Sequence, residues 1–188
     1  MNGAVLISIA LVVPASVLAQ DSAKTELFGG YLYSRVEGSN LNGWNASIAQ
    51  NLTRHLGIVA DFGGNYKSQS ETVSGVNASA RAKLYSFMAG PRFYTGLNER
   101  WTPFAHALFG ATHASIKATG SAGDTSVSLS ESDTAFSMAF GGGIDCRLTR
   151  RLAVRLVQAD YMLIRSGGEN TNGARISTGI VFRLGKRE

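Results

Sequence analysis

The residues best suited to chemistry are a histidine and a serine two positions apart, His113 and Ser115. An imidazole within hydrogen-bond reach of a serine hydroxyl can activate that oxygen for acyl transfer, and Glu131 or Asp133 could orient the ring. The segment around them is rich in serine, however, and such pairs arise there by chance. We therefore expect no catalytic residues, and we keep a hydrolase only as an alternative.

Two further patterns bear on ligand binding. Gly141-Gly142-Gly143 could be mistaken for a phosphate-binding loop, but it precedes no helix and lacks the lysine of a P-loop. Glycines that let a strand bend are the better interpretation. Histidine and cysteine do not occur at metal-ligand spacing. The sequence therefore predicts neither a cofactor nor a metal site.

Composition and the first residues set the class of protein. An apolar run over 4–13 followed by Val17-Leu18-Ala19 is typical of a secretory signal, so we predict a signal peptide over 1–19 and one domain over 20–188. The single cysteine, Cys146, cannot form an internal disulfide. A net charge of +5 would suit nucleic acid, but export and the lack of a basic helix argue against that partner.

The rest of the chain divides into segments with the alternation of β-strands. Eight can be drawn, at about 25–36, 41–51, 56–66, 81–95, 101–116, 134–147, 152–165 and 174–184. Three tight connections, at 52–56, 97–101 and 148–152, share one pattern. Each has a leucine, then a small polar residue, a charged residue, a basic residue and a large apolar residue. The other four, at 37–40, 67–80, 117–133 and 166–173, are polar and mostly longer. Short turns at one end and long loops at the other are typical of an outer-membrane barrel.

Alternate residues of these segments form two contrasting faces. One face, which includes Phe87, Phe109 and Phe140, has no charged residue in 29 positions, whereas the other has six. A soluble lipocalin-like barrel would turn the apolar face inward, and a membrane barrel would turn it outward. The polar face has no lysine and no glutamate, which a water-facing sheet would carry. The sequence therefore favours an all-β, eight-stranded antiparallel up-and-down transmembrane β-barrel; the orientation of the first strand stays open. In the seventh strand Val157 is assigned to the polar face, but Gln158, Asp160 and Tyr161 suggest a bulge in its second half.

This architecture assigns places to three groups of side chains. Charged and polar residues of the second face are predicted to pair and fill the lumen; they are Asp61, Arg92, His106, Asp145, Arg155, Asp160, Arg175 and Arg183. A gated narrow pore, in which such pairs exchange partners, is the alternative. Trp44 and Trp101 are predicted to lie at opposite membrane interfaces. Arg81, Lys83, Lys117 and Arg165 would lie at the rim, either near lipopolysaccharide phosphates or as ordinary solvated charges.

Several segments carry a family resemblance: LNGWNASIA (41–49), GPRF (90–93), PFAHALFG (103–110), AFGGGID (139–145), AVRLVQADY (153–161) and RISTGIVFRL (175–184). Through them the chain resembles the outer-membrane β-barrel domain family related to the transmembrane domain of outer membrane protein A. The resemblance implies location in the cell outer membrane, a structural or surface-presenting role, and contact with outer-membrane lipid, lipopolysaccharide and the barrel-assembly machinery. We expect a monomer that is not an enzyme, with adhesion through the loops 67–80 and 117–133 as the alternative function.

A second resemblance concerns His113 and Ser115. His113-Ala-Ser115 is similar to the His-x-Ser of outer-membrane lipid A deacylases. The residues that follow, Ile116-Lys117-Ala118-Thr119, depart from that motif. A lipid A-modifying hydrolase is therefore the less favoured alternative.

Overall fold

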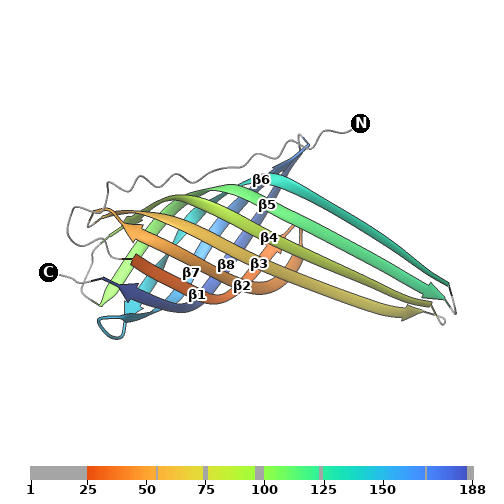
Figure 1. The fold of residues 1–188 in the computed structure, drawn as a ribbon, viewed down its shortest axis with the longest axis horizontal. Helices are drawn as coiled ribbons and strands as arrows, with labels where there is room; N and C mark the ends of the chain where they lie inside the picture. Colours follow the sequence, from red (N-terminus) through yellow and green to blue (C-terminus); the bar gives the residue numbers. More distant parts are fainter. Residues whose placement is uncertain are drawn as a thin grey trace.

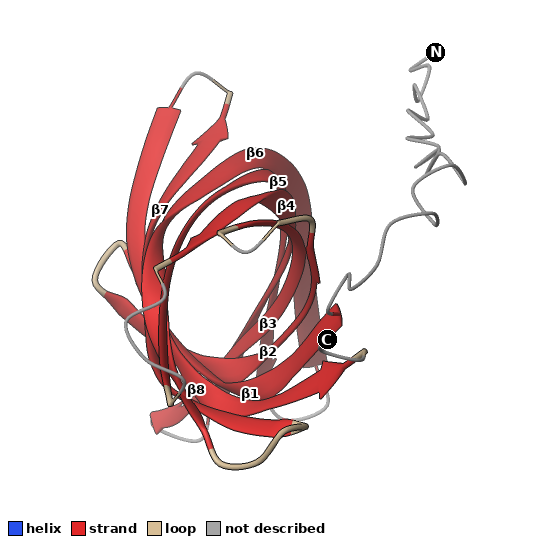
Figure 2. Cartoon of the chain, turned by 90° about the vertical axis from the view of Figure 1, so that its left-hand side faces the viewer, coloured by secondary structure: helices blue, strands red, loops and turns tan. Residues whose placement is uncertain are grey.

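The chain forms a closed barrel of eight antiparallel strands in a computed structural model, which describes residues 25–53, 55–73, 76–95, 100–122, 125–167 and 169–185 (Figures 1 and 2). The strands are β1 (Thr25–Val36), β2 (Ser39–Asn51), β3 (Leu56–Val73), β4 (Val76–Tyr94), β5 (Trp101–Ala122), β6 (Thr125–Arg147), β7 (Leu152–Ser166) and β8 (Glu169–Leu184). Each strand pairs with the next in sequence, and β8 pairs with β1. The predicted fold class is confirmed, whereas the predicted signal peptide at 1–19 lies outside the described residues.

The two faces of the sheet are oriented as the residue alternation predicts. Phe87, on the apolar face, is 54% exposed on the outer surface, whereas Arg155, on the polar face, is 0% exposed. None of the 29 residues predicted to face outward is buried. In β1, Phe28 and Leu32 are buried and Tyr31 is exposed, which settles the orientation that the sequence leaves open. The outer surface is therefore apolar and the interior polar, as a membrane barrel requires.

One strand departs from strict alternation. The pairing of β7 with β8 shifts between Arg155 and Gln158, so that Leu156 and Val157 both face outward. The irregularity predicted near Gln158 is thus present. The assignment of Val157 to the polar face is wrong, because the bulge inserts a residue and reverses the alternation after it.

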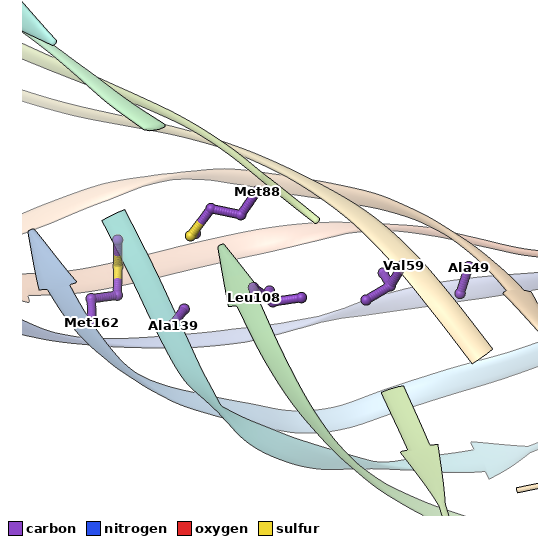
Figure 3. Close-up of a cluster of buried hydrophobic side chains, with 6 residues drawn as sticks. All are labelled: Ala49, Val59, Met88, Leu108, Ala139 and Met162. Carbon is purple, nitrogen blue, oxygen red and sulfur yellow. The ribbon is translucent and has the colours of Figure 1, made fainter. Parts of the chain in front are cut away.

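Part of the interior is apolar. Met88, Leu108, Ala139 and Met162, with Ala49 and Val59, form a buried cluster inside the barrel (Figure 3). Their side chains come from β2 to β7, on the same face of the sheet as the buried charges. The interior is therefore packed with side chains of both kinds.

The segments 67–80 and 117–133 were predicted to be loops, and this prediction is wrong for their described residues, 67–73, 76–80, 117–122 and 125–133, which continue the strands. The pairing of β3 with β4 runs on to Val73 and Val76, and that of β5 with β6 to Ala122 and Thr125. β8 likewise begins at Glu169, five residues earlier than the sequence indicates. Apolar alternation reports only the part of a strand that meets hydrocarbon, whereas backbone pairing continues into the polar region.

These continuations form a sheet that projects beyond the rest of the barrel. β2 pairs with β3 only as far as Tyr66, and β7 pairs with β6 only from Phe136. β3, β4, β5 and β6 therefore extend together past their neighbours (Figure 1).

In the described part of the chain, no helix has the length and hydropathy that spanning a membrane demands.

The opposite end of the barrel is closed by tight turns with a common construction. In the turn between β6 and β7, the Thr149 hydroxyl accepts the backbone N–H groups of Arg151 and Leu152 at 3.3 and 3.0 Å. Thr53 accepts those of His55 and Leu56 at 3.3 and 3.0 Å between β2 and β3. The repeated pattern therefore corresponds to a repeated turn. In the third turn, residues 96–99 lie outside the described residues.

Candidate functional site

The charged residues of the interior lie along one line of strand neighbours. Arg92 on β4 is opposite His106 on β5, which is opposite Gly141 on β6. Gly141 is opposite Asp160 on β7, which is opposite Arg175 on β8. All four side chains point into the barrel and are buried. The sheet register alone thus brings together residues that are up to 83 positions apart in sequence.

Within this line, Asp160 receives hydrogen bonds from two sides. Its Oδ1 lies 2.7 Å from His106 Nε2, and its Oδ2 accepts from Arg175 Nε at 2.7 Å. Arg175 also donates from Nη1 to Asp61 Oδ1 at 2.8 Å. Arg175 therefore joins the carboxylates of β3 and β7 across the interior. Hydrogen-bonded charges of opposite sign offset the cost of removing each from water.

Gly141 makes the His106–Asp160 contact possible. His106 and Asp160 are on strands that flank β6, and Gly141 lies between them in the register. A Cβ at this position would collide with Asp160 Oδ1 and with the backbone of Ala159. The glycine triplet therefore has a local role here, because the missing side chain leaves the path from β5 to β7 open.

A second group lies around Arg155. Its Nε and Nη2 donate to the two carboxylate oxygens of Asp145 at 2.8 and 3.2 Å, and its Nη1 donates to Gln158 at 2.7 Å. Its guanidinium carbon lies 4.3 Å from the ring centre of Phe28 and 4.4 Å from that of Phe104. Arg155 is thus held by a bidentate ion pair and by two aromatic faces, arrangements that suit arginine and not lysine.

Arg92 is the exception to the predicted pairing. It is buried, and in the described part of the chain none of the ion pairs involves it; its Nε and Nη2 have no hydrogen-bond partner there. Its guanidinium carbon instead lies 4.5 Å from the ring centre of Phe104. A cation–π contact therefore replaces the expected carboxylate.

Sequence reasoning missed two members of the interior network. Glu26 is buried and accepts from Arg183 Nε at 3.0 Å and from the Tyr94 hydroxyl at 3.2 Å. Gln158 donates to Asp160 Oδ2 at 2.9 Å. Glu26 belongs to the strand whose orientation was open, and Gln158 follows the bulge. A search for the carboxylate partner of Arg183 among paired strand ends could have found Glu26.

The four residues predicted at the rim do not all lie together. Arg81 on β4 is directly opposite Lys117 on β5, and Lys83 is opposite Ser115. These three basic side chains are exposed. Arg165 is also exposed, but it is on β7 opposite Phe136, with β6 between it and Lys117. A basic patch therefore consists of Arg81, Lys83 and Lys117 only.

The two tryptophans are on the outer surface near opposite ends of the barrel. Trp44 donates from Nε1 to the Tyr66 hydroxyl at 3.2 Å, and Tyr66 packs edge-to-face with Tyr85. These aromatic residues adjoin Lys83, which is opposite Tyr66 in the register. Trp101 is 37% exposed at the start of β5, beside a tight turn. Such positions suit aromatic residues at the two boundaries of a hydrocarbon layer.

His113 and Ser115 are not arranged as a catalytic pair. The imidazole Nδ1 of His113 lies 2.9 Å from the Thr134 hydroxyl, and Ser115 is opposite Ser132. Asp133 accepts from the Ser166 hydroxyl and from the Thr134 N–H. These hydrogen bonds, that from Ser166 first, hold the pKa of Asp133 below its ordinary value. The hydrogen bonds of His113 Nδ1 and of the Asp133 carboxylate are therefore with Thr134 and Ser166.

Comparison with known proteins identifies the fold family. Residues 5–183 match the family model described as outer membrane protein beta-barrel domain. Among curated proteins, none matches the chain. The chain is similar in fold to three solved barrels, which are too distant in sequence for more than that conclusion.

The first is Ail, the attachment invasion locus protein of Yersinia pestis, solved in complex with the heparin analogue sucrose octasulfate (24% identity, TM-score 0.61, 87% of this chain and 99% of that one). Neisserial surface protein A matches with 13% identity and a TM-score of 0.55, over 86% of this chain and 96% of that one. A major outer membrane protein of Thermus thermophilus matches with 8% identity and a TM-score of 0.56, over 87% and 100%.

Proposed function

Because the chain belongs to the outer membrane protein β-barrel domain family and resides in the outer membrane, we propose that it is a structural barrel with a filled lumen, which supports the envelope and conducts no solute. It is a non-enzymatic protein in this proposal. It folds as a monomer with the help of the barrel-assembly machinery, and it is surrounded by outer-membrane lipid and lipopolysaccharide.

The contact of Arg155 with opposite walls carries this proposal. Arg155 on β7 touches Phe28 on β1 and Phe104 on β5, and β1 and β5 are four strands apart in a ring of eight. The Arg175 bridge between Asp61 and Asp160 adds a second crossing. Opening a path between these groups would separate buried ion pairs, which costs about 3–5 kcal/mol for each broken pair. This cost favours a plug over a gated pore.

Conductance and envelope assays test the proposal. Purified protein in planar bilayers is expected to give no conductance steps, while a strain that lacks the gene should become sensitive to detergent. A barrel with shortened hairpins, in which Asn-Gly replaces 70–79 and 119–128, should restore detergent resistance, because the closed barrel alone suffices. Stable conductance steps from the wild-type protein, or failure of the shortened barrel to restore resistance, would contradict the proposal.

A surface-binding role is the second candidate, and the basic patch on the projecting sheet favours it. Arg81, Lys83 and Lys117 are exposed above the aromatic residues Tyr66 and Tyr85, with Ser115 beside them. Cations interleaved with hydroxyl groups suit phosphate or sulfate groups carried by a saccharide. Lipopolysaccharide of the same membrane and a sulfated glycan outside the cell share this chemistry, and Ail has been solved with a heparin analogue.

The two sources of anion are distinguished by where binding occurs. We expect Arg81→Gln/Lys83→Gln/Lys117→Gln to weaken binding of whichever source is correct, compared with Arg165→Gln as the control outside the patch. Loss of lipopolysaccharide from the purified protein would indicate the membrane source, and loss of retention on immobilised heparin would indicate the external one. If the triple variant keeps both, the patch has no such ligand.

A further inference from the structure

Among the described residues, the unbalanced positive charge lies mainly at one end of the barrel. The described residues that point into the lumen include four basic and four acidic ones, and those of the projecting end include six basic and five acidic ones. At the tight-turn end, the described residues include four basic ones, Arg100, Arg147, Arg150 and Arg151, and no acidic one. The described turn end is therefore the most basic part of the barrel.

The basic residues of the described turns lie close to the apolar outer surface. Arg100 immediately precedes Trp101, and Arg150 and Arg151 follow Leu148, which is 55% exposed. Arg100, Arg150 and Arg151 are all exposed. Because the turns are tight, these guanidinium groups cannot extend far from the edge of the hydrocarbon-facing band. They therefore lie at the depth where lipid headgroups begin.

Two of the turns are joined to each other and to the neighbouring strand. The Arg147 N–H donates to the Arg100 carbonyl oxygen at 2.8 Å, and the Arg183 N–H donates to that of Arg151 at 2.8 Å. An open depression of about 300 Å³ lies between Arg100, which precedes β5, and the turn between β6 and β7. It is lined by Arg100, Arg147, Leu148 and Thr149. It presents the Arg100 guanidinium and the Thr149 hydroxyl beside the apolar Leu148 side chain. A phosphate with an acyl chain has the complementary combination.

We propose that the turn end binds the phosphate groups of anionic phospholipids, so that the barrel gathers these lipids in the leaflet that faces its turns. The position of the arginines at the hydrocarbon boundary favours a lipid over an acidic protein, since a protein partner would be met by groups that project into water. Basic residues near an anionic lipid surface attract its phosphate groups. The proposal goes beyond the structural role and uses only the assumption that the barrel spans a lipid bilayer.

Quenching of Trp101 fluorescence by brominated lipids tests the proposal. In a Trp44→Phe background, Trp101 is the single tryptophan and reports on lipid at the turn end. In vesicles of phosphatidylcholine and phosphatidylglycerol, we expect brominated phosphatidylglycerol to quench Trp101 with an apparent preference of about threefold or more over brominated phosphatidylcholine. The preference should shrink when NaCl is raised from about 0.1 to 0.5 M.

Charge variants at the two ends supply the controls. Arg100→Gln/Arg150→Gln/Arg151→Gln should reduce the preference to about one, whereas the three Lys replacements at these positions should keep it, because only charge is required. Arg35→Gln/Lys67→Gln/Arg165→Gln changes the net charge equally at the far end, outside the basic patch, and should leave the preference unchanged.

Three results would overturn the proposal: equal quenching by both lipids, a preference that survives the Gln variant, and an equal loss in the far-end variant. Capture of an acidic protein without a lipid preference would assign the turn end to a protein partner instead. Absence of quenching by either lipid would show that the barrel has not inserted. That last result contradicts the membrane premise itself and is thus distinct from a lost preference.

Discussion

His106 and Asp160 are on strands that do not pair with each other, yet His106 Nε2 lies 2.7 Å from Asp160 Oδ1. The contact passes over β6 at Gly141, where a Cβ would lie 2.2 Å from the carboxylate oxygen. A single glycine thus determines whether His106 can join the buried network around Asp160.

Gly141→Ala is therefore expected to lower the free energy of unfolding by about 1–3 kcal/mol, because the added methyl group displaces Asp160 or pushes β6 outward. Urea unfolding of the barrel in lipid vesicles measures this change. Gly29→Ala is the matched control, since a Cβ there meets nothing within 4 Å. It should change stability by less than about 0.5 kcal/mol. Equal effects of the two substitutions would refute the role assigned to Gly141.

The ion pair between Arg155 and Asp145 gives a larger expected effect. Both side chains are 0% exposed. Asp145→Asn leaves the guanidinium with a buried charge that has lost its counter-charge, and we expect a loss of about 3–5 kcal/mol in the same unfolding measurement. Glu131→Gln removes an exposed carboxylate from the same strand and should have little effect. A loss below about 1 kcal/mol for Asp145→Asn would indicate that the lumen is hydrated enough to solvate Arg155.

How far the sequence leads can be judged from these same residues. Alternation assigns four charged or polar side chains to the interior correctly, because each of their strands has one apolar face and one polar face. They are Asp61 on β3, Arg92 on β4, His106 on β5 and Arg175 on β8. Alternation cannot assign Glu26, because glycine and aromatic residues occupy both faces of β1. It also fails at Val157, because the residue types suggest a bulge near Gln158 but do not fix the position at which the alternation reverses.

The projecting sheet marks the other limit of sequence reasoning. Residues 67–72 and 130–133 are polar on both faces, so no periodic signal there separates strand from loop. Pairing with a neighbour that continues in register, such as Arg81 opposite Lys117, is a property of two strands together. The specific partners within the lumen, such as His106 with Asp160 across β6, likewise depend on register and on the absence of a side chain at Gly141.

The tight turns offer a test of the repeated threonine. Thr149→Ala removes the acceptor of two backbone N–H groups, and we expect a loss of about 0.5–1.5 kcal/mol in stability. Thr149→Ser keeps the hydroxyl and should retain most of the stability. If Ser and Ala behave alike, the hydroxyl has no part in the turn and the sequence repeat has another cause.

The hydrogen bonds to Asp133 predict a dependence on pH at the projecting end. Because they lower the pKa of this carboxyl, their contribution to stability is complete above its ordinary pKa and is lost as the pH falls through the lower value of the folded state. Ser166→Ala removes the principal donor and should raise the pKa of Asp133 toward its ordinary value. Carboxyl NMR chemical shifts between about pH 2 and 6 measure it. An unchanged pKa in Ser166→Ala would contradict the assignment.

The central claim is that the apolar face of the sheet meets hydrocarbon and the charged face lies inside. It is tested most directly by attaching spin labels one at a time at Ser86, Phe87, Met88 and Ala89 of β4, in a Cys146→Ser background, and measuring collision with oxygen in lipid vesicles. The account predicts high oxygen accessibility at Phe87 and Ala89 and low accessibility at Ser86 and Met88. The reverse alternation, or uniform accessibility to a water-soluble nickel reagent, would contradict it.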